Sequence, residues 1–250
     1  MGTWYYEIHF GNIHRTMKKL LAAALLVLSA QAQAHDLWLE REGEGFGLYY
    51  GHKHAGHEGL KFMEFKPEWV REALCFDATG SEVAFQSSQS PPTHPYRIPR
   101  ECAAACVLTS SGYWTKTPYG TENLPKAEVR MAIKSWLSFE SVKRIDRWSA
   151  ALAEPLTAWL EMTPLGDPAS LREGKKLRLR VSFNGQPVEG VVVSYDGKPR
   201  GTTGRDGKIN IRLRHGGFQV IQASLTRPDA SGKVDEVIHS ANLNFELPEE

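Results

Sequence analysis

The C-terminal part of the chain alternates apolar and polar residues in short runs. From Gly174 onward, the text "KKLRLRVSFNGQPVEGVVVSYDGKPRGTTGRDGKINIRLRHGGFQVIQASL" is divided by Asn-Gly, Asp-Gly and Gly-Gly pairs. Alternation with a period of two predicts half-buried strands, and these pairs favour tight hairpin turns. The buried faces are expected to include Leu177, Leu179, Val181, Phe183, Val191, Val193, Ile209, Ile211 and Leu213. About six such strands predict a small β-sandwich.

The region 35–163 is less regular but also predicts strands. "HDLWLERE" and "EGFGLYYGH" suggest a strand pair joined at Gly43–Gly45, and "REALCFDATG", "SEVAFQ" and "AACVLTSSGYW" suggest further strands. Between 126 and 148, apolar residues at helical spacing predict one short helical segment. These residues are Val129, Ile133, Trp136 and Leu137.

The expected fold is therefore mainly β, with two β-sandwich-like domains at 35–163 and 164–250 and a linker near "TPLGDPAS". In the second domain, the order "GQPVEGVVV", "TTGRDGKINI" and "GGFQV" resembles the immunoglobulin-like or transthyretin-like modules of many secreted proteins. Because such modules are usually scaffolds, this resemblance says little about chemistry.

Residues 17–34, "MKKLLAAALLVLSAQAQA", have the pattern of a cleavable signal peptide. Two lysines precede an apolar run that is shorter than the roughly 20 residues of a membrane-spanning helix. The run ends in Ala-Gln-Ala, a small-x-small cleavage pattern. Met17 is the more natural start, which leaves residues 1–16 as an N-terminal extension. We expect cleavage after Ala34, export to the periplasm and no transmembrane segment in the mature chain.

Charge argues against a nucleic-acid partner. The full chain has 30 basic and 29 acidic residues, and removing residues 1–34 takes away three basic residues and one acidic residue. The mature chain then carries 27 basic and 28 acidic residues, without a basic run. Phosphate binding requires clustered Lys and Arg, so nucleic acid is excluded as an expected partner.

The three cysteines, Cys75, Cys102 and Cys106, would enter an oxidising compartment where a disulfide persists. We favour a Cys75–Cys102 bridge, because both cysteines lie in or beside predicted strands that could pair. A Cys102–Cys106 bridge is the alternative. A zinc site is weakly indicated, since no C-x-x-C pair occurs.

Candidate chemistry is concentrated in "YYGHKHAGHEG", which holds His52, His54 and His57 in a chain with nine histidines. Imidazole nitrogen suits nickel, cobalt, copper and zinc, whereas calcium and magnesium prefer clustered oxygen ligands. On an extended segment, His52 and His54 project to the same side, and Gly56 allows the chain to turn so that His57 returns toward them. This pattern predicts half of a metal coordination shell, and the alternative is a solvated loop.

Cleavage after Ala34 would add a second contribution. His35 would then offer both its α-amine and its imidazole to one metal ion. A short hairpin through residues 42–46 would set this new terminus beside the histidine segment. The predicted ligands are therefore His35, His52, His54 and His57.

The remaining candidates have weaker support. Asp36 and Glu58 could be ligands, hydrogen-bond partners of ligands, or solvated residues. His215 could approach the site from the second domain, while His94 and His239 are expected to be ordinary structural residues. The chain has no G-x-S-x-G, H-E-x-x-H or P-loop motif, so a hydrolase is not indicated.

Several segments together resemble a known bacterial family. They are "AHDLWLE", "LYYGHKHAGHEG", "SSGYWTKTPYG", "SWLSFESVKRI" and "YDGKPRGTTGRDG". The chain is similar to periplasmic nickel- and cobalt-uptake components (NikM-like or NikK-like) associated with ABC-type or energy-coupling-factor transporters. The resemblance implies a non-enzymatic accessory protein that captures Ni(II) or Co(II) and delivers it to membrane transporter components. The four histidine ligands are inferred from this chain and not from the family.

Two other functions compete with metal delivery. An N-terminal histidine together with a second histidine also resembles the histidine brace of copper carriers and copper-dependent oxidative enzymes, and Cu(II) would bind such a site tightly. The other alternative is an adhesion or envelope protein with incidental histidines. Nickel, cobalt and copper, the transporter partner and the oligomeric state all stay open at this level.

Overall fold

The structure is a computed structural model that describes residues 36–53, 66–85 and 95–249 of the chain. The strands in this part are β1 (Asp36–Glu42), β2 (Gly45–Gly51), β3 (Val70–Phe76), β4 (Tyr96–Ile98), β5 (Ala104–Thr117), β6 (Gly120–Glu122), β7 (Lys134–Ile145), β8 (Glu161–Pro164), β9 (Lys176–Phe183), β10 (Gln186–Pro187), β11 (Val192–Tyr195), β12 (Lys198–Thr202), β13 (Lys208–Arg212), β14 (Gly217–Pro228) and β15 (Glu236–Leu247). The only helices among the described residues are the 3-10 turns η1 (Pro67–Trp69), η2 (Lys126–Glu128), η3 (Ala150–Ala153) and η4 (Pro168–Ser170).

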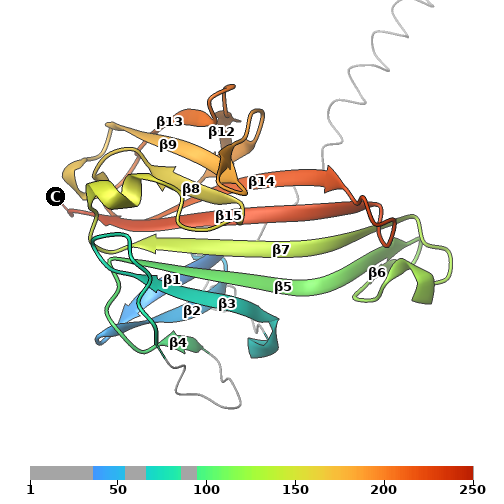
Figure 1. Cartoon of the computed structure of the whole chain (residues 1–250). Helices are drawn as coiled ribbons and strands as arrows, with labels where there is room; N and C mark the ends of the chain where they lie inside the picture. Colours follow the sequence, from blue (N-terminus) through green and yellow to red (C-terminus); the bar gives the residue numbers. More distant parts are fainter. Residues whose placement is uncertain (1–35, 54–65, 86–94, 250) are drawn as a thin grey trace, which may run out of the picture. The chain divides into compact units, whose positions relative to one another are not determined.

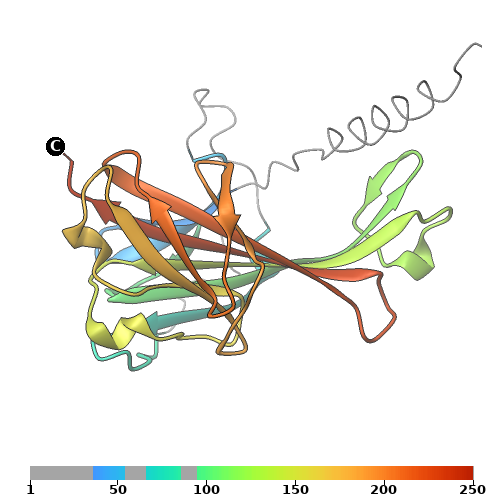
Figure 2. The ribbon, with the colours of Figure 1, turned by 90° about the horizontal axis from the view of Figure 1, so that it is seen from above.

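The strands form one large sheet with a smaller sheet on each face (Figure 1). The large sheet has eight strands in the order β12-β11-β14-β15-β7-β5-β3, with β6 also paired to β5. A four-stranded sheet of β8, β9, β10 and β13 lies on one face, and a three-stranded sheet in the order β1-β2-β4 lies on the other. Figure 2 shows that the long strands β5, β7, β14 and β15 continue beyond the part that the small sheets cover.

Burial along β5 explains this layering. Ala104 and Cys106 belong to the apolar core under the four-stranded sheet, whereas Ala105 and Val107 belong to the core under the three-stranded sheet. Because successive side chains of a strand point to opposite faces, β5 is buried on both sides at this end. The mainly β, sandwich-like fold predicted from the sequence is confirmed.

Strand pairing crosses the boundary that the sequence suggested at residues 163 and 164. β8, which contains both positions, pairs with β9, and β15 runs parallel to β7 from Glu236↔Trp136 to Asn244↔Arg144. The described strands belong to one compact unit, His35–Glu250. The segments 35–163 and 164–250 thus contribute strands to shared sheets.

The helix predicted between 126 and 148 is wrong. Only η2 is helical there, and Trp136 and Leu137 lie on β7. The physical reason is that β7 has a partner on each side, β5 (antiparallel) and β15 (parallel), and this pairing outweighs a chance helical spacing of four apolar residues. No helix in the described part of the chain has the length and apolar character needed to span a membrane.

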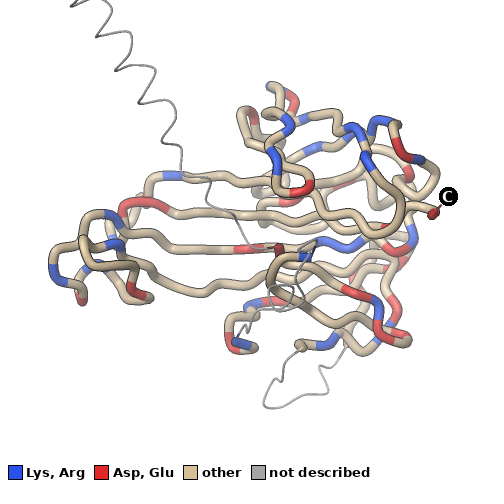
Figure 3. Tube along the Cα trace, turned by 180° about the vertical axis from the view of Figure 1, so that it is seen from behind, with Lys and Arg blue, Asp and Glu red and all other residues tan. Residues whose placement is uncertain are grey.

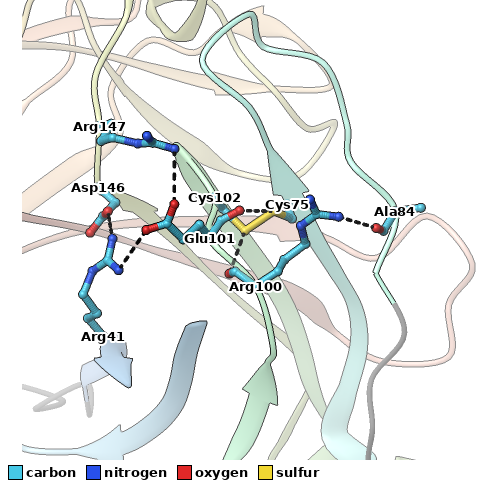
Figure 4. The surroundings of a disulfide bond; sticks show 8 residues. All are labelled: Arg41, Cys75, Ala84, Arg100, Glu101, Cys102, Asp146 and Arg147. Atoms are coloured by element: carbon cyan, nitrogen blue, oxygen red, sulfur yellow. Dashed lines mark hydrogen bonds and ion pairs between the residues drawn. A yellow bond between two sulfur atoms is a disulfide. The ribbon is translucent and has the colours of Figure 1, made fainter. Parts of the chain in front are cut away.

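The predicted disulfide between Cys75 and Cys102 is confirmed (Figure 4). Cys106 is a free, buried cysteine. Around the bridge, Arg41 of β1 forms ion pairs with Asp146 and Glu101. The disulfide therefore fixes the edge of β3 at the place where the three-stranded sheet is tied to the large sheet. A stable disulfide is typical of proteins in oxidising compartments.

A buried ion pair joins β7 to β8 on the opposite face. The Lys143 Nζ atom lies 2.6 Å from the Glu161 Oε1 atom, and each side chain is only 3% exposed. The Glu161 carboxylate also accepts hydrogen bonds from the backbone N–H groups of Leu156 and Thr157. With these donors the buried charge is satisfied, which is the condition under which such a pair is tolerated in a core.

Removing the disulfide should cost more stability than removing the free thiol. The bridge closes a loop with a sequence separation of 27, so the Cys75→Ala/Cys102→Ala variant is expected to lose ~3 kcal/mol of unfolding free energy. Cys106→Ala should lose ~1 kcal/mol, from lost packing alone. Urea unfolding without reductant measures both values. A larger loss for Cys106→Ala would contradict the assignment.

Candidate metal centre

The β1–β2 hairpin brings the start of the described chain opposite the residue that precedes His52. The two strands pair antiparallel, from Glu42↔Gly45 at the turn to Asp36↔Gly51 at the open end. The turn uses Gly43 at φ 60°, a conformation that glycine adopts without strain. The strand pair and the turn predicted from the sequence are confirmed. The open end of this hairpin is the candidate metal centre.

The structure places one of the four predicted ligands. His52 follows β2 directly and is half-buried. His35, His54 and His57 lie outside the described residues, as do Glu58 and His94. Asp36 is the first described residue and follows His35 directly in the chain. Its pairing with Gly51 therefore places the start of the described chain opposite the residue that precedes His52.

Both carboxylate oxygens of Asp36 accept hydrogen bonds at this open end. The backbone N–H of Lys53 donates to Oδ2 at 2.9 Å, across the hairpin. The side-chain amide of Gln222, from β14 of the large sheet, donates to Oδ1 at 3.0 Å. Asp36 thus joins the two strands of the hairpin end and ties that end to the sheet beneath it. The structure supports a hydrogen-bonding role for Asp36, one of the options that the sequence left open.

The hydrogen-bond network that includes Asp36 continues across the large sheet. The Gln222 amide also donates to Asn242 Oδ1 of β15 at 3.3 Å, and the Asn242 amide donates to Glu140 Oε1 of β7 at 3.2 Å. Asn242 is only 2% exposed and gives a further hydrogen bond to the Ser141 carbonyl. Three neighbouring strands, β14, β15 and β7, therefore each supply one polar side chain to a single network that ends at Asp36.

The middle of β1 is held to the same sheet by its backbone. The Leu39 N–H donates to the Asn244 side chain of β15 at 3.1 Å, and the Leu39 carbonyl accepts from Arg144 of β7 at 3.4 Å. Leu39 itself is fully buried. A strand with its backbone groups satisfied in this way has little freedom to slide, so the position of Asp36 on the sheet is fixed.

Lys53, on the far side of His52, is held at both ends. Its backbone N–H donates to Asp36, and its ammonium group pairs with Glu40 of β1. The same Nζ atom lies 4.6 Å from the centre of the Phe218 ring and 5.5 Å from that of Trp38, within the range of cation–π attraction. Because Gly51 is in the hairpin and Lys53 is anchored, the backbone of His52 is restricted between them.

Figure 3 shows that charged residues gather at the loops and ends of the sheets, with long stretches of strand free of charge. Glu140, in the middle of β7, departs from this pattern. Burial, together with the nearby negative charge of Asp36, raises the pKa of Glu140 to about 7, although its hydrogen bond from Asn242 acts in the opposite direction. Burial and the charge of Glu140 likewise raise the pKa of Tyr50. Further negative charge at the hairpin end is thus unfavourable, so Glu140 keeps its proton to a higher pH than an exposed carboxyl group does.

The described histidines outside this end have structural contacts. The His215 ring lies 2.8 Å from the Gly216 carbonyl and 3.2 Å from the Asp196 carboxylate. Burial lowers the pKa of His215, but these two partners outweigh burial and raise it above its ordinary value. His239 stacks on Phe139 at 5.5 Å between ring centres, and burial lowers its pKa. His239 therefore has a packing role, as the sequence suggested.

One family matches most of the chain. The match covers residues 32–227 and carries the description "Domain of unknown function (DUF4198)". The chain belongs to the DUF4198 family. Comparison with the curated proteins found no match, and comparison with the solved structures found none either. The DUF4198 description names no metal and no transporter, so nickel and cobalt uptake stays a prediction.

The DUF4198 match includes the whole hairpin and Gln222 but ends before β15. Sequence reasoning missed Gln222, Asn242 and Glu140. The available pattern was the pair Asn242 and Asn244 at alternate positions of β15. These two residues lie between Ala241, Leu243 and Phe245, whose side chains form the apolar face of the same strand. Buried amides at alternate positions indicate a sheet face that carries polar partners rather than solvent.

Among the described residues, no three His, Cys, Asp or Glu side chains form a complete metal-binding group. At the open end of the hairpin, the described residues of this DUF4198 chain supply one imidazole, that of His52, and a hydrogen-bond network around Asp36 that fixes the backbone on each side of His52. Any full coordination shell at this end would also require donors from outside the described ranges.

The raised pKa of Glu140 predicts a pH-dependent stability. Between its ordinary value of 4.5 and the folded value of about 7, the folded state keeps a proton that the unfolded chain has released. Wild-type stability should therefore fall as pH rises through this window, relative to Glu140→Gln, which retains an acceptor for Asn242. From pH 5 to pH 8 the change should be about 2–3 kcal/mol. Urea unfolding at both pH values measures it, and a pH-independent difference would contradict the assignment.

Proposed function

We propose that this protein is an exported metal carrier that captures Ni(II), or Co(II), at the open end of the β1–β2 hairpin. The proposed ligands are His35, His52, His54 and His57. Imidazole donors favour a late transition metal over calcium or magnesium. The observation that carries the proposal is the register Asp36↔Gly51, since these two residues adjoin His35 and His52 in the chain.

The proposal includes processing of the N-terminus. Cleavage of a signal peptide after Ala34 would release the α-amine of His35, which would then bind the same metal ion as its imidazole. The Cys75–Cys102 disulfide supports an oxidising compartment such as the periplasm. The captured ion would be passed to the membrane components of a nickel or cobalt transporter, as the resemblance implies.

The Asp36 carboxylate supports the proposal because it holds the hairpin end in place. Both oxygens of the Asp36 carboxylate accept hydrogen bonds, from the Lys53 N–H and the Gln222 amide, and this fixes the chain directly after His52. A metal carrier, unlike an enzyme, requires only a coordination site that can bind the ion and release it. Cu(II) would bind the same donors tightly in solution, so affinity for copper does not by itself identify the natural ion.

Replacement of His52 tests the proposal. His52→Ala should weaken Ni(II) binding by ~10-fold or more, because one imidazole donor is lost. The matched control is His239→Asn, which removes an imidazole from an aromatic stack and should leave nickel affinity unchanged. Titration calorimetry with nickel sulfate measures both variants, on protein whose first residue has been verified by mass spectrometry.

Metal analysis of the exported protein gives an independent check. Protein recovered from the bacterial periplasm without added metal should contain nickel or cobalt at close to one ion per chain. A metal-free wild type that also fails to bind nickel in the titration would contradict the proposed function. Equal nickel affinity in wild type and His52→Ala would remove His52 from the site.

A further inference from the structure

Exposed apolar side chains gather at the far end of the long strands. Of the five large apolar residues that are exposed in the described part of the chain, four lie in the connection between β5 and β7: Tyr119, Leu124, Met131 and Ile133. Figure 2 shows that this end of the sheet projects beyond the part that the small sheets cover. We call residues 116–134 the arm tip. Exposed apolar side chains gathered in one place mark interaction sites, whereas singly scattered ones do not.

The backbone of the arm tip is strained at one of these residues. Met131 has φ 59°, a left-handed conformation that is unfavourable for a residue with a long side chain, and it is 63% exposed. Glycine would adopt the same φ without strain. Strained positions of this kind cluster at functional sites, where the surrounding structure enforces them. Contact with a partner is a function that suits an exposed methionine side chain.

Hydrogen bonds hold the arm tip in a defined shape. The Ile133 N–H donates to the Lys116 carbonyl at 2.7 Å, and the Tyr119 N–H donates to the Thr117 hydroxyl at 3.1 Å. Both apolar residues are therefore attached to the same end of β5. The Asn123 side-chain amide also donates to two backbone carbonyls of β5. A surface ordered in advance loses less conformational entropy on binding than a loose loop does.

The charges at the arm tip favour a second copy of this chain as the partner. Residues 116–134 contain four basic and two acidic residues. Lys126 and Lys134 form ion pairs with Asp235 and Glu236, which lie beside the arm tip. With these two carboxylates there are four charges of each sign, so a strongly charged partner such as an anionic membrane gains no net attraction. Balanced charge suits a two-fold contact, in which a patch meets its own copy.

We propose that the arm tip is a self-association surface, through which two copies of this chain form a dimer around a two-fold axis. Because the arm tip projects beyond the small sheets, two tips can meet while the rest of each chain stays apart (Figure 2). Tyrosine, methionine and arginine, all present at the arm tip, are enriched in protein–protein interfaces. The inference goes beyond metal capture and does not depend on it.

Sedimentation velocity of the exported protein over a range of concentrations tests the proposal. Wild type should form a dimer, and Ile133→Ser should raise the dimer dissociation constant by ~10-fold or more, because an apolar contact at the interface is lost. The matched control is Val192→Ser, which makes a similar change at the exposed apolar residue of β11, outside the arm tip. Val192→Ser should dimerise like wild type.

Met131→Gly separates contact with the second copy from stability of the fold. Since glycine suits φ 59°, this variant should unfold at a temperature no lower than that of wild type. Its dimer dissociation constant should nevertheless rise by ~10-fold, because the methionine side chain is absent from the interface. A variant that keeps its fold and loses the dimer supports the contact role directly.

Three outcomes would overturn the proposal. They are a wild type that stays monomeric at every concentration, unchanged dimerisation of Ile133→Ser and Met131→Gly, and an equal loss of the dimer in Val192→Ser. Flotation of monomeric wild type with vesicles of phosphatidylcholine and phosphatidylglycerol would also overturn it, because the arm tip would then bind a membrane surface. These results leave nickel binding untouched, since the substituted residues lie outside the candidate metal centre.

Discussion

The hydrogen bonds to Asp36 are the constraint on which the candidate site depends. One oxygen accepts from the Lys53 N–H and the other from the Gln222 amide, so a single carboxylate closes the hairpin and attaches it to the large sheet. Without this attachment, the open end of a two-stranded hairpin would fray, since isolated hairpins are marginal in water. The chain segments that carry the histidines depart from this fixed point.

The rest of the fold supports that point from both faces of the large sheet. Beneath β1, the Leu39 backbone is held by Asn244 and Arg144. On the opposite face, the Lys143–Glu161 pair joins β7 to β8 under the four-stranded sheet. β7 carries Glu140 and Arg144 on one face and Lys143 on the other, so one strand contributes to the Asp36 hydrogen-bond network, to the attachment of β1 and to the buried ion pair.

Local sequence patterns predicted the elements that depend on interactions between residues close together in the chain. The β1–β2 turn follows from Gly43 between two alternating runs, and buried Leu177, Leu179 and Val181 follow from the period of two. The parallel pairing of β15 with β7 was not predictable, since it joins residues about a hundred positions apart. The network of Gln222, Asn242 and Glu140 depends on that pairing, so it was missed together with it. The same pairing explains why helical spacing near Trp136 was misleading.

The central claim is that freeing the amine of His35 completes a nitrogen-donor site next to the anchored hairpin end. The most direct measurement compares nickel affinity in two chains, one beginning at His35 and one with a single alanine added ahead of it. The account predicts affinity weaker by ~10-fold or more in the extended chain, because its α-amine can no longer chelate together with the His35 imidazole. Equal affinity in the two chains would contradict it.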